Sequence, residues 1–254
     1  MKKLLLSFAM LAALPFAKAG EPIDVSETYL KNNKAPFEVT GETLIDDNTR
    51  WQKLAAPWVT AGDLTDESTG NITTWHVDFQ KYPNYPAPGD ANSKGVIAIT
   101  PGWDGFAGTF SNMKLYQSFT LPAGQYELTG LRAQDWTGAT GAYLVAAKGK
   151  GLPNIEDLST GALGSAQFST ATEAGLWTLS VNFKLTEETE ISIGAVASYS
   201  SAKQCVTLAE LKLYKFEGAN FKVLNALIAS SKKYTSTEYP IGTTSGTFPQ
   251  AKWD

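Results

Sequence analysis

The feature that most limits what this chain can fold into is a strict alternation of apolar and polar side chains over residues 177–185. The apolar members are Trp177, Leu179, Val181, Phe183 and Leu185, and every residue between them is polar. A period of two places successive side chains on opposite faces of a β-strand. Further strand signals alternate at 73–79, 112–121 and 126–133, are apolar runs at 96–99 and 143–147, and end with 191–193 and 206–214. Residues 72–216 show no helical period. These patterns predict an all-β fold, an antiparallel jelly-roll β-sandwich.

Turn chemistry separates the predicted strands. Pro122-Ala123-Gly124 predicts a tight turn, because proline fixes φ and glycine accepts positive φ. In the strand that follows, the apolar phase changes across Gly130. A phase change at a glycine is typical of a β-bulge, so we predict one there.

A signal for export precedes the β region. Lys2 and Lys3 form a basic start, residues 4–16 are an apolar run, and Ala17-Lys18-Ala19 supplies the small residues that a signal peptidase accepts. The run is shorter than the roughly 20 residues that span a bilayer, which argues against the alternative of a retained anchor. We predict cleavage after Ala19 and a product that is secreted, periplasmic or on the cell surface. No later segment predicts a membrane span.

The hydrophobic period changes after the last predicted strand. Apolar residues recur at helical spacing at Phe221, Leu224, Leu227 and Ile228. This spacing predicts a short amphipathic helix, which needs a partner surface and suggests a protein partner. The domain prediction is a signal peptide at 1–19, the sandwich at 20–216, and a helix with a turn-rich tail at 217–254. We interpret this last part as a truncated helical domain.

The amino-acid composition limits the partners and the kinds of site that this chain can have. Charged residues make up 18% of the chain, the formal net charge is −4 and there is no basic stripe, which argues against a nucleic-acid partner. His76 and Cys205 are the only histidine and cysteine. An intramolecular disulfide is therefore excluded, a zinc site is disfavoured, and we predict no catalytic residue.

Three stretches carry a family resemblance. Residues 115–126 combine an apolar-x-Gln-x-apolar strand with Pro-x-Gly-x-Tyr, residues 177–214 form three successive strands, and Asn32 precedes Pro36-Phe37-Glu38. Together they resemble galactose-binding-like jelly rolls, a group that includes carbohydrate-binding modules, over about residues 24–216. The resemblance is to a branch found in secreted proteins of Gram-negative, polysaccharide-degrading bacteria, in which helical repeats follow the sandwich. It implies the fold more strongly than the function, because such modules serve many tasks.

The resemblance also implies an optional structural calcium ion. Related jelly rolls hold one between the N-terminal segment and the last strand, with backbone carbonyls and a carboxylate as ligands. Glu210 is similar to that carboxylate, and Asp24, Glu38 or Asp78 are the candidates to assist it. No other cofactor is expected.

Two glycine-flanked connections carry tryptophan next to aspartate. Trp103 and Asp104 lie within one, and Asp135 and Trp136 follow a predicted strand in the other. Aromatic rings accept the C–H face of a sugar, carboxylates bind its hydroxyls, and glycines let backbone and ligand approach closely. The alternative is that these tryptophans plug the ends of the sandwich.

A third connection, residues 81–90, is stiffened by prolines and carries Tyr82 and Tyr85. These rings either line a groove or remain solvated at an edge. All six side chains, Trp103, Asp104, Asp135, Trp136, Tyr82 and Tyr85, are the predicted ligand-binding set, and Glu210 and Asp24 are the predicted metal ligands.

The sequence favours a secreted, non-catalytic carbohydrate-binding module that binds glycan or polysaccharide weakly through its loop tryptophans. One alternative is a structural or protein-interaction module of a cell-surface assembly. Another is a glycan-active enzyme, with Asp104 and Asp135 as the carboxylate pair to test, because glycoside hydrolysis needs only two carboxylates.

Overall fold

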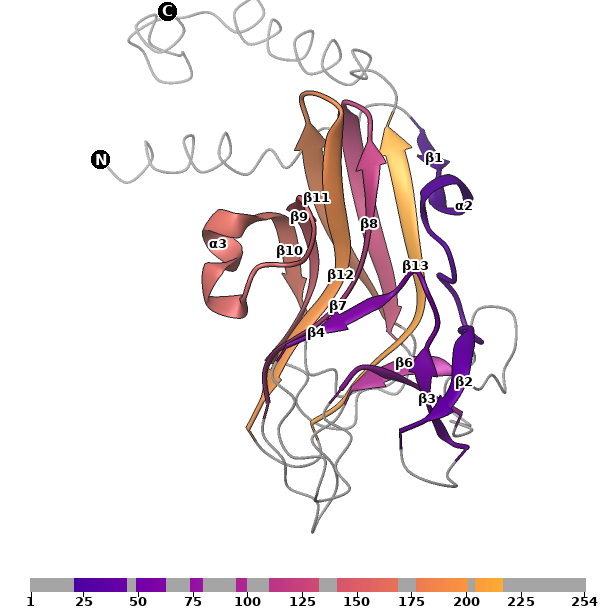
Figure 1. The fold of residues 1–254 in the computed structure, drawn as a ribbon. Helices are drawn as coiled ribbons and strands as arrows, with labels where there is room; N and C mark the ends of the chain where they lie inside the picture. Colours follow the sequence, from indigo (N-terminus) through magenta and orange to yellow (C-terminus); the bar gives the residue numbers. More distant parts are fainter. Residues whose placement is uncertain are drawn as a thin grey trace, which may run out of the picture. The chain divides into compact units, whose positions relative to one another are not determined.

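The computed structural model of the chain is a sandwich of two antiparallel β-sheets (Figure 1). It describes residues 21–44, 49–62, 74–79, 95–99, 110–132, 141–168, 177–200 and 204–216. Residues Ile23–Lys215 form one compact unit. The all-β class and the antiparallel sandwich predicted from the alternating pattern are confirmed.

Within the described residues the larger sheet has eight strands and the smaller sheet has five. The larger sheet contains β1 (Pro22–Asp24), β2 (Val39–Thr43), β3 (Trp51–Leu54), β5 (His76–Asp78), β6 (Val96–Ile99), β8 (Gly124–Arg132), β11 (Trp177–Leu185) and β13 (Val206–Phe216). Its order is β11-β8-β13-β6-β5-β3-β2, with β1 paired to β13. The smaller sheet contains β4 (Val59–Ala61), β7 (Phe110–Leu121), β9 (Ala142–Lys148), β10 (Ala162–Gln167) and β12 (Thr189–Tyr199), in the order β10-β9-β12-β7-β4.

The predicted turn at residues 122–124 joins β7 to β8, and so links the two sheets. The Tyr126 hydroxyl donates to the Pro122 carbonyl at 2.9 Å, and its ring stacks on Phe183 of β11. This arrangement explains the tyrosine of the Pro-x-Gly-x-Tyr motif, because its hydroxyl satisfies a carbonyl of the turn while its ring fills the core.

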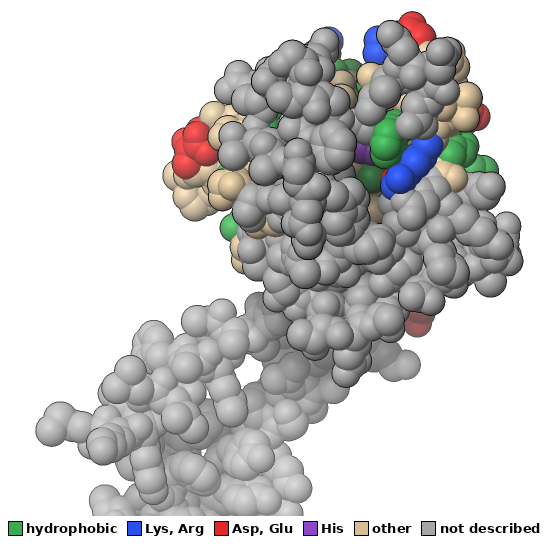
Figure 2. All heavy atoms as spheres, turned by 90° about the horizontal axis from the view of Figure 1, so that it is seen from below, with side chains coloured by type: hydrophobic (Ala, Val, Ile, Leu, Met, Phe, Trp, Pro, Cys, Tyr) green, Lys and Arg blue, Asp and Glu red, His purple; other side chains and the backbone are tan. Residues whose placement is uncertain are grey.

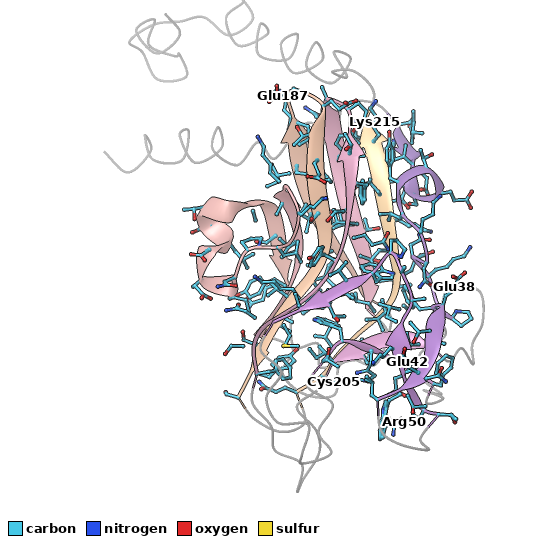
Figure 3. All side chains as sticks on the ribbon, in the orientation of Figure 1. Glu38, Glu42, Arg50, Glu187, Cys205 and Lys215 are labelled. Carbon is cyan, nitrogen blue, oxygen red and sulfur yellow. The ribbon has the colours of Figure 1, made fainter. Side chains whose placement is uncertain are left out.

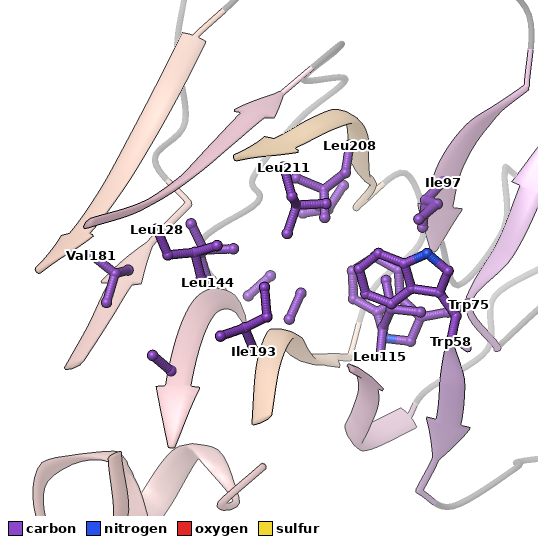
Figure 4. Packing of buried hydrophobic residues seen from close by; sticks show 14 of the residues in the cluster. Trp58, Trp75, Ile97, Leu115, Leu128, Leu144, Val181, Ile193, Leu208 and Leu211 are labelled. Carbon is purple, nitrogen blue, oxygen red and sulfur yellow. The ribbon is translucent and has the colours of Figure 1, made fainter. Parts of the chain in front are cut away.

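The core lies between the two sheets (Figure 4). Leu128 of the larger sheet and Leu144 and Ile193 of the smaller sheet are fully buried. Trp75 is also buried in this core, as the apolar phase of its strand predicts, and its Nε1 donates to the Met113 carbonyl at 3.0 Å. The indole therefore adds apolar area without leaving a buried donor unsatisfied.

Asn32 folds the N-terminal segment into place after the short helix α2 (Ser26–Tyr29). Its Nδ2 donates to the Glu38 carbonyl at 3.1 Å, and its Oδ1 accepts the Glu38 N–H at 2.7 Å. The Asn32 carbonyl in turn accepts the Trp58 Nε1–H at 2.7 Å. Asn32 has a φ of 47°, a left-handed conformation that asparagine tolerates better than most residues.

Residues 149–161 form a cap on the outer face of the smaller sheet, and contain the 3₁₀ helix η3 (Ile155–Asp157) and the helix α3 (Leu158–Gly161) (Figure 1). Leu152 and Leu158 of the cap pack with three outward-facing side chains of the sheet, Val145, Ala147 and Val196. The cap thus converts part of a face that would meet water into a second small core.

Strand β5 differs from the sequence prediction. The alternating pattern places His76 and Asp78 on a wet face, whereas both side chains are buried. The reason is that β5 is an interior strand between β3 and β6, and Arg50, next to β3, covers Asp78. Both faces of β5 are therefore covered.

The predicted bulge at Gly130 does not interrupt the pairing of β8 with β11, whose register is continuous from Gly124↔Leu185 to Arg132↔Trp177. A Cβ at Gly130 would lie 3.1 Å from the Leu144 side chain of the opposite sheet. Close approach of the two sheets accounts for the glycine.

The predicted signal peptide (1–19) and the predicted helix and tail (217–254) lie outside the described residues, and remain predictions. In the part of the chain that the structure describes, no helix has the length and apolar character needed to cross a bilayer.

Candidate functional site

Seven strand ends gather at one end of the sandwich, which we name the loop end. The register pairs that place them there are Ile99–Val206, Arg132–Trp177, Ala142–Ala197 and Phe110–Tyr199. In each pair the first residues of one strand lie beside the last residues of another. In Figure 1 these strand ends of both sheets lie at the bottom of the sandwich. Cys205 is at the loop end, and Glu187, in the turn between β11 and β12, is at the opposite end (Figure 3).

Both tryptophan-bearing connections start and finish at the loop end. Residues 100–109, with Trp103 and Asp104, join β6 to β7. Residues 133–140, with Asp135 and Trp136, join β8 to β9. These four side chains lie outside the described residues, so their contacts with a ligand remain predictions. The described strands establish that the two connections are anchored at the same end.

The connection with Tyr82 and Tyr85 is anchored elsewhere, and these two residues also lie outside the described ranges. It follows β5 and precedes β6, and Asp78 of β5 pairs with Val96 at the start of β6. Residue Ile99, which precedes the Trp103 connection, is at the other end of β6. The structure therefore does not bring the anchor points of the tyrosine connection to the loop end.

Aromatic side chains of β7, β12 and the residue that follows β10 fill the core at the loop end. Phe110 and Tyr199 pack edge to face with ring centroids 5.3 Å apart, and Phe168 is fully buried. The Phe168 N–H donates to the Ala142 carbonyl at 2.9 Å, which fixes its position beside the start of β9. Figure 2 views the molecule from this side and shows acidic, basic and hydrophobic side chains of the described residues around its rim.

A buried ion pair stabilises the β3–β5 region. Arg50 donates from Nε and Nη2 to the two Asp78 oxygens, each at 2.9 Å, and its guanidinium lies 4.6 Å from the centre of the Trp51 ring. The Asp78 side chain is 4% exposed, whereas that of Arg50 is 35% exposed. This bidentate geometry holds the arginine flat against the indole.

His76 lies beside this pair. Its Nδ1 is 2.9 Å from the Thr74 carbonyl, which can only accept, so Nδ1 carries the proton. Burial lowers the pKa of His76 below its ordinary value of 6.5, and the effect exceeds the opposing effects of the Thr74 hydrogen bond and the Asp78 charge. His76 is therefore a neutral, structural histidine near pH 7.

The charge of Lys212 interacts with both predicted metal ligands, Glu210 and Asp24. The Lys212 Nζ is 3.3 Å from Glu210 Oε2, and the Glu210 side chain is 13% exposed. Burial by itself lowers the pKa of Lys212, but Glu210, with smaller effects from Tyr214 and Asp24, raises it overall. The Asp24 carboxylate also accepts the Ser26 N–H at 2.9 Å.

This donor set does not fit a calcium ion well, because calcium takes six to eight oxygen ligands. Among the described residues no three His, Cys, Asp or Glu side chains gather in a group that could hold a metal. Of the other candidates, Asp78 is bound by Arg50, and Glu38 is exposed. Calcium binding remains a prediction for experiment.

Sequence reasoning missed a polar cluster where the cap meets β7. Asn112 has a φ of 52°, its Oδ1 accepts the Ile155 N–H at 2.8 Å, and its Nδ2 donates to the Glu156 carboxylate at 3.1 Å. The Asn112 N–H donates to Ser198 Oγ at 2.8 Å. No local pattern marks these residues, because Asn112 and Glu156 are 44 positions apart.

Comparison with protein families gives one match. The model of a family described as "Domain of unknown function (DUF5013)" matches residues 31–194. A search of curated proteins found no match.

Several solved structures have a similar fold. TmCBM61 in complex with β-1,4-galactotriose is 16% identical, with 74% of this chain and 97% of that chain covered and a TM-score of 0.44. The K1 cleaved adhesin domain of Lys-gingipain from Porphyromonas gingivalis W83 is 14% identical (68% and 95% covered, TM-score 0.41). The Stig cyclase Fisc from Fischerella sp. TAU is 14% identical (70% and 96% covered, TM-score 0.45). The names of these three proteins describe different tasks, and the likeness concerns the fold alone.

Proposed function

The chain belongs to the DUF5013 family, and from that premise we propose that its sandwich is an exported, non-catalytic carbohydrate-binding module that contacts glycan through Trp103 and Trp136. The observation that carries this proposal is the common anchorage of the two connections at the loop end. The two connections carry Trp–Asp pairs that are far apart in the sequence. They start after Ile99 and Arg132 and finish before Phe110 and Ala142, and the register places these four residues at the loop end. Loops held by a rigid sandwich are where such proteins meet ligands.

The filled core at the loop end supports a ligand-binding role over a plugging role. Phe110, Tyr199 and Phe168 already supply large rings to the interior there. This favours our proposal that Trp103 and Trp136 serve a sugar ligand rather than the core.

The described surface gives little support to the alternative of a protein-docking module. Among the described residues the large hydrophobic side chains that are exposed are Ile23 and Val59, each 43% exposed, on strands β1 and β4 of different sheets. Large contiguous apolar patches on a surface mark protein-interaction sites. Glycan recognition needs only a few rings with polar groups around them.

The proposed affinity is weak. Two aromatic contacts contribute about 0.5–1.5 kcal/mol each by analogy with aromatic pairs. Hydrogen bonds from Asp104 and Asp135 must add the rest. Dissociation constants on the order of 10 μM to 1 mM follow.

The test is a polysaccharide array probed with the mature protein and with Trp103→Ala, Trp136→Ala and the double variant. Trp253→Ala is the matched control, since it removes an indole outside the predicted sandwich. The proposal expects selective loss of signal in the two loop variants and none in the control. Unchanged binding by the double variant would rule the proposed site out.

Export has its own test. We propose that the protein is exported from the cytoplasm and that its signal peptide is cleaved behind Ala19. Intact-mass measurement of the protein purified from its native compartment should give a chain that starts at Gly20. A chain that still begins with Met1 would contradict this proposal.

A further inference from the structure

The buried ring of His76 has one nitrogen without a hydrogen-bond partner among the described residues. The Thr74 carbonyl fixes the ring by accepting the Nδ1 proton, so the second nitrogen, Nε2, carries a lone pair and can only accept. None of the described residues donates a hydrogen bond to it. His76 is 1% exposed, and a buried acceptor without a donor is unfavourable. A donor from outside the chain would therefore be stabilised at Nε2.

The strand register places His76 on the outer face of the larger sheet. It pairs with Ala98 of β6, while the next pair, Val77 and Ile97, lies in the core between the sheets. Figure 2 shows the histidine, the only one in the chain, at the floor of a small hollow beside a basic and a hydrophobic side chain. The ring can therefore be reached from outside, although little of it is exposed.

Trp51 lies on the same outer face, close to His76. It pairs with Asp78, which follows His76 by two residues, and diagonal neighbours on one face of antiparallel strands are roughly 7–8 Å apart. Trp51 is half-buried, and among the described residues its indole packs against neither hydrophobic cluster of the sandwich. Part of the indole is therefore within reach of a ligand that also contacts His76.

The charges at this site cancel. Arg50, whose guanidinium lies over the Trp51 ring, donates from Nε and Nη2 to the two Asp78 oxygens. Burial lowers the pKa of His76 in spite of the Asp78 charge, so the imidazole is neutral near pH 7. A neutral acceptor beside a compensated ion pair suits a hydroxyl group, whereas a carboxylate has no proton to donate to Nε2.

We propose that this hollow is a second glycan subsite, in which a sugar hydroxyl donates to His76 Nε2 and the sugar ring lies against the accessible part of the Trp51 indole. Aromatic rings accept the C–H face of a sugar, and a few polar groups fix its orientation. The spacing of the two side chains suits one neutral sugar unit. The choice of a sugar rests on the proposed carbohydrate-binding function, but the subsite itself does not depend on Trp103 or Trp136.

The single histidine makes a direct test possible, provided that the protein carries no histidine tag. Long-range proton–nitrogen spectra of the nitrogen-15-labelled mature protein, recorded above the pKa of His76, report Nδ1 and Nε2 of one imidazole. Neutral mono- and oligosaccharides are added to about 10 mM, roughly ten times the weakest dissociation constant proposed for this protein. The fully O-methylated form of each sugar is the matched control, because it has no hydroxyl to donate. We expect a saturable shift of Nε2 with the sugars, little change at Nδ1, and no shift with the methylated forms.

Two substitutions of the histidine separate its two nitrogens. His76→Asn keeps a donor with the reach of Nδ1 for the Thr74 carbonyl, but has no group with the reach of Nε2. His76→Gln reaches the Nε2 position, where its oxygen can accept. We expect His76→Asn to weaken sugar binding about three- to tenfold, the effect of one hydrogen bond, and His76→Gln to retain more of the affinity. Trp51→Ala should also weaken binding, and thermal unfolding shows whether each variant is folded.

Three outcomes would overturn the subsite. Without an Nε2 shift for any sugar, water alone reaches the histidine. An equal shift with the methylated sugars would exclude a hydroxyl donor. A shift that disappears in the Trp103→Ala and Trp136→Ala double variant would mean that His76 only reports binding at the loop end. If the shift persists in that double variant, the subsite stands even where the array test rules the loop-end site out, so the two proposals fail separately.

Discussion

The side-chain amide of Gln117 forms two hydrogen bonds with the backbone of Lys31. Gln117 Oε1 accepts the Lys31 N–H at 3.1 Å, and Gln117 Nε2 donates to the Lys31 carbonyl at 2.6 Å. Gln117 is buried on the inward phase of β7, as a buried amide satisfied by backbone should be. It pairs with the N-terminal segment as another strand would, and so joins residues 86 positions apart.

Replacing Gln117 should therefore loosen the N-terminal segment. We expect Gln117→Leu to lower the free energy of unfolding by about 1–3 kcal/mol, because it leaves the Lys31 backbone groups without partners. Chemical denaturation measures this. Lys31→Ala is the matched control, since it keeps the backbone groups and should change stability by less than about 0.5 kcal/mol. Equal effects of the two changes would contradict the assignment.

The Arg50–Asp78 pair should be more important for stability than the Lys53–Glu42 pair. Arg50→Ala removes the guanidinium from the buried Asp78 carboxylate. We expect it to lower the free energy of unfolding by about 2–3 kcal/mol. This is less than for a fully buried pair, because Arg50 is partly exposed. Lys53 and Glu42 are both exposed, so Lys53→Ala should cost at most about 1 kcal/mol. Urea unfolding of both variants gives the comparison. A Lys53→Ala effect as large as that of Arg50→Ala would refute it.

His76 should make the protein less stable in mild acid. Its pKa in the folded protein is below 6.5 and is near 6.5 in the unfolded chain, so the unfolded chain binds the proton first as the pH falls. The stability that neutral His76 confers is complete above pH 6.5 and is lost progressively below it. Unfolding curves between pH 7.5 and about pH 5 should show this decrease. In the His76→Gln variant the free energy of unfolding should change less with pH over this range, whatever the stability of the variant at pH 7.5. An unchanged pH dependence would exclude His76 as the cause.

Because of Lys212, the thermal stability of the sandwich should not depend on calcium. Its ammonium lies 3.3 Å from Glu210 and close to Asp24, where it supplies the positive charge that those carboxylates need. We expect the melting temperature to be the same in millimolar calcium and in EDTA. Lys212→Met removes that charge, and any stabilisation by calcium should then appear in the variant alone. A calcium-dependent melting temperature in the wild type would show that an ion is held.

The sequence patterns predicted the sandwich because burial on one face leaves a period of two in each strand. They also predicted the turn at 122–124 from its proline and glycine, whereas the contacts of Tyr126 with Pro122 and Phe183 were found only in the structure. They missed the burial of His76 and Asp78, because that depends on Arg50 reaching β5 from the approach to β3, a long-range contact with no local pattern.

Only part of the candidate site could be predicted from the sequence. The two Trp–Asp pairs are visible as local motifs. Their anchorage at the same end depends on the order of strands that are far apart in the sequence, which no local pattern predicts. The Asn112–Glu156 contact and the cap were missed because they join β7 to a segment more than 40 residues later.

Calorimetric titration of the mature protein with the best-binding polysaccharide, side by side with the Trp103→Ala and Trp136→Ala double variant, tests the central claim most directly. The account predicts that the double variant loses about tenfold or more in affinity, as the loss of two aromatic contacts implies, with an unchanged melting temperature. Equal affinity for the wild type and the double variant would contradict it.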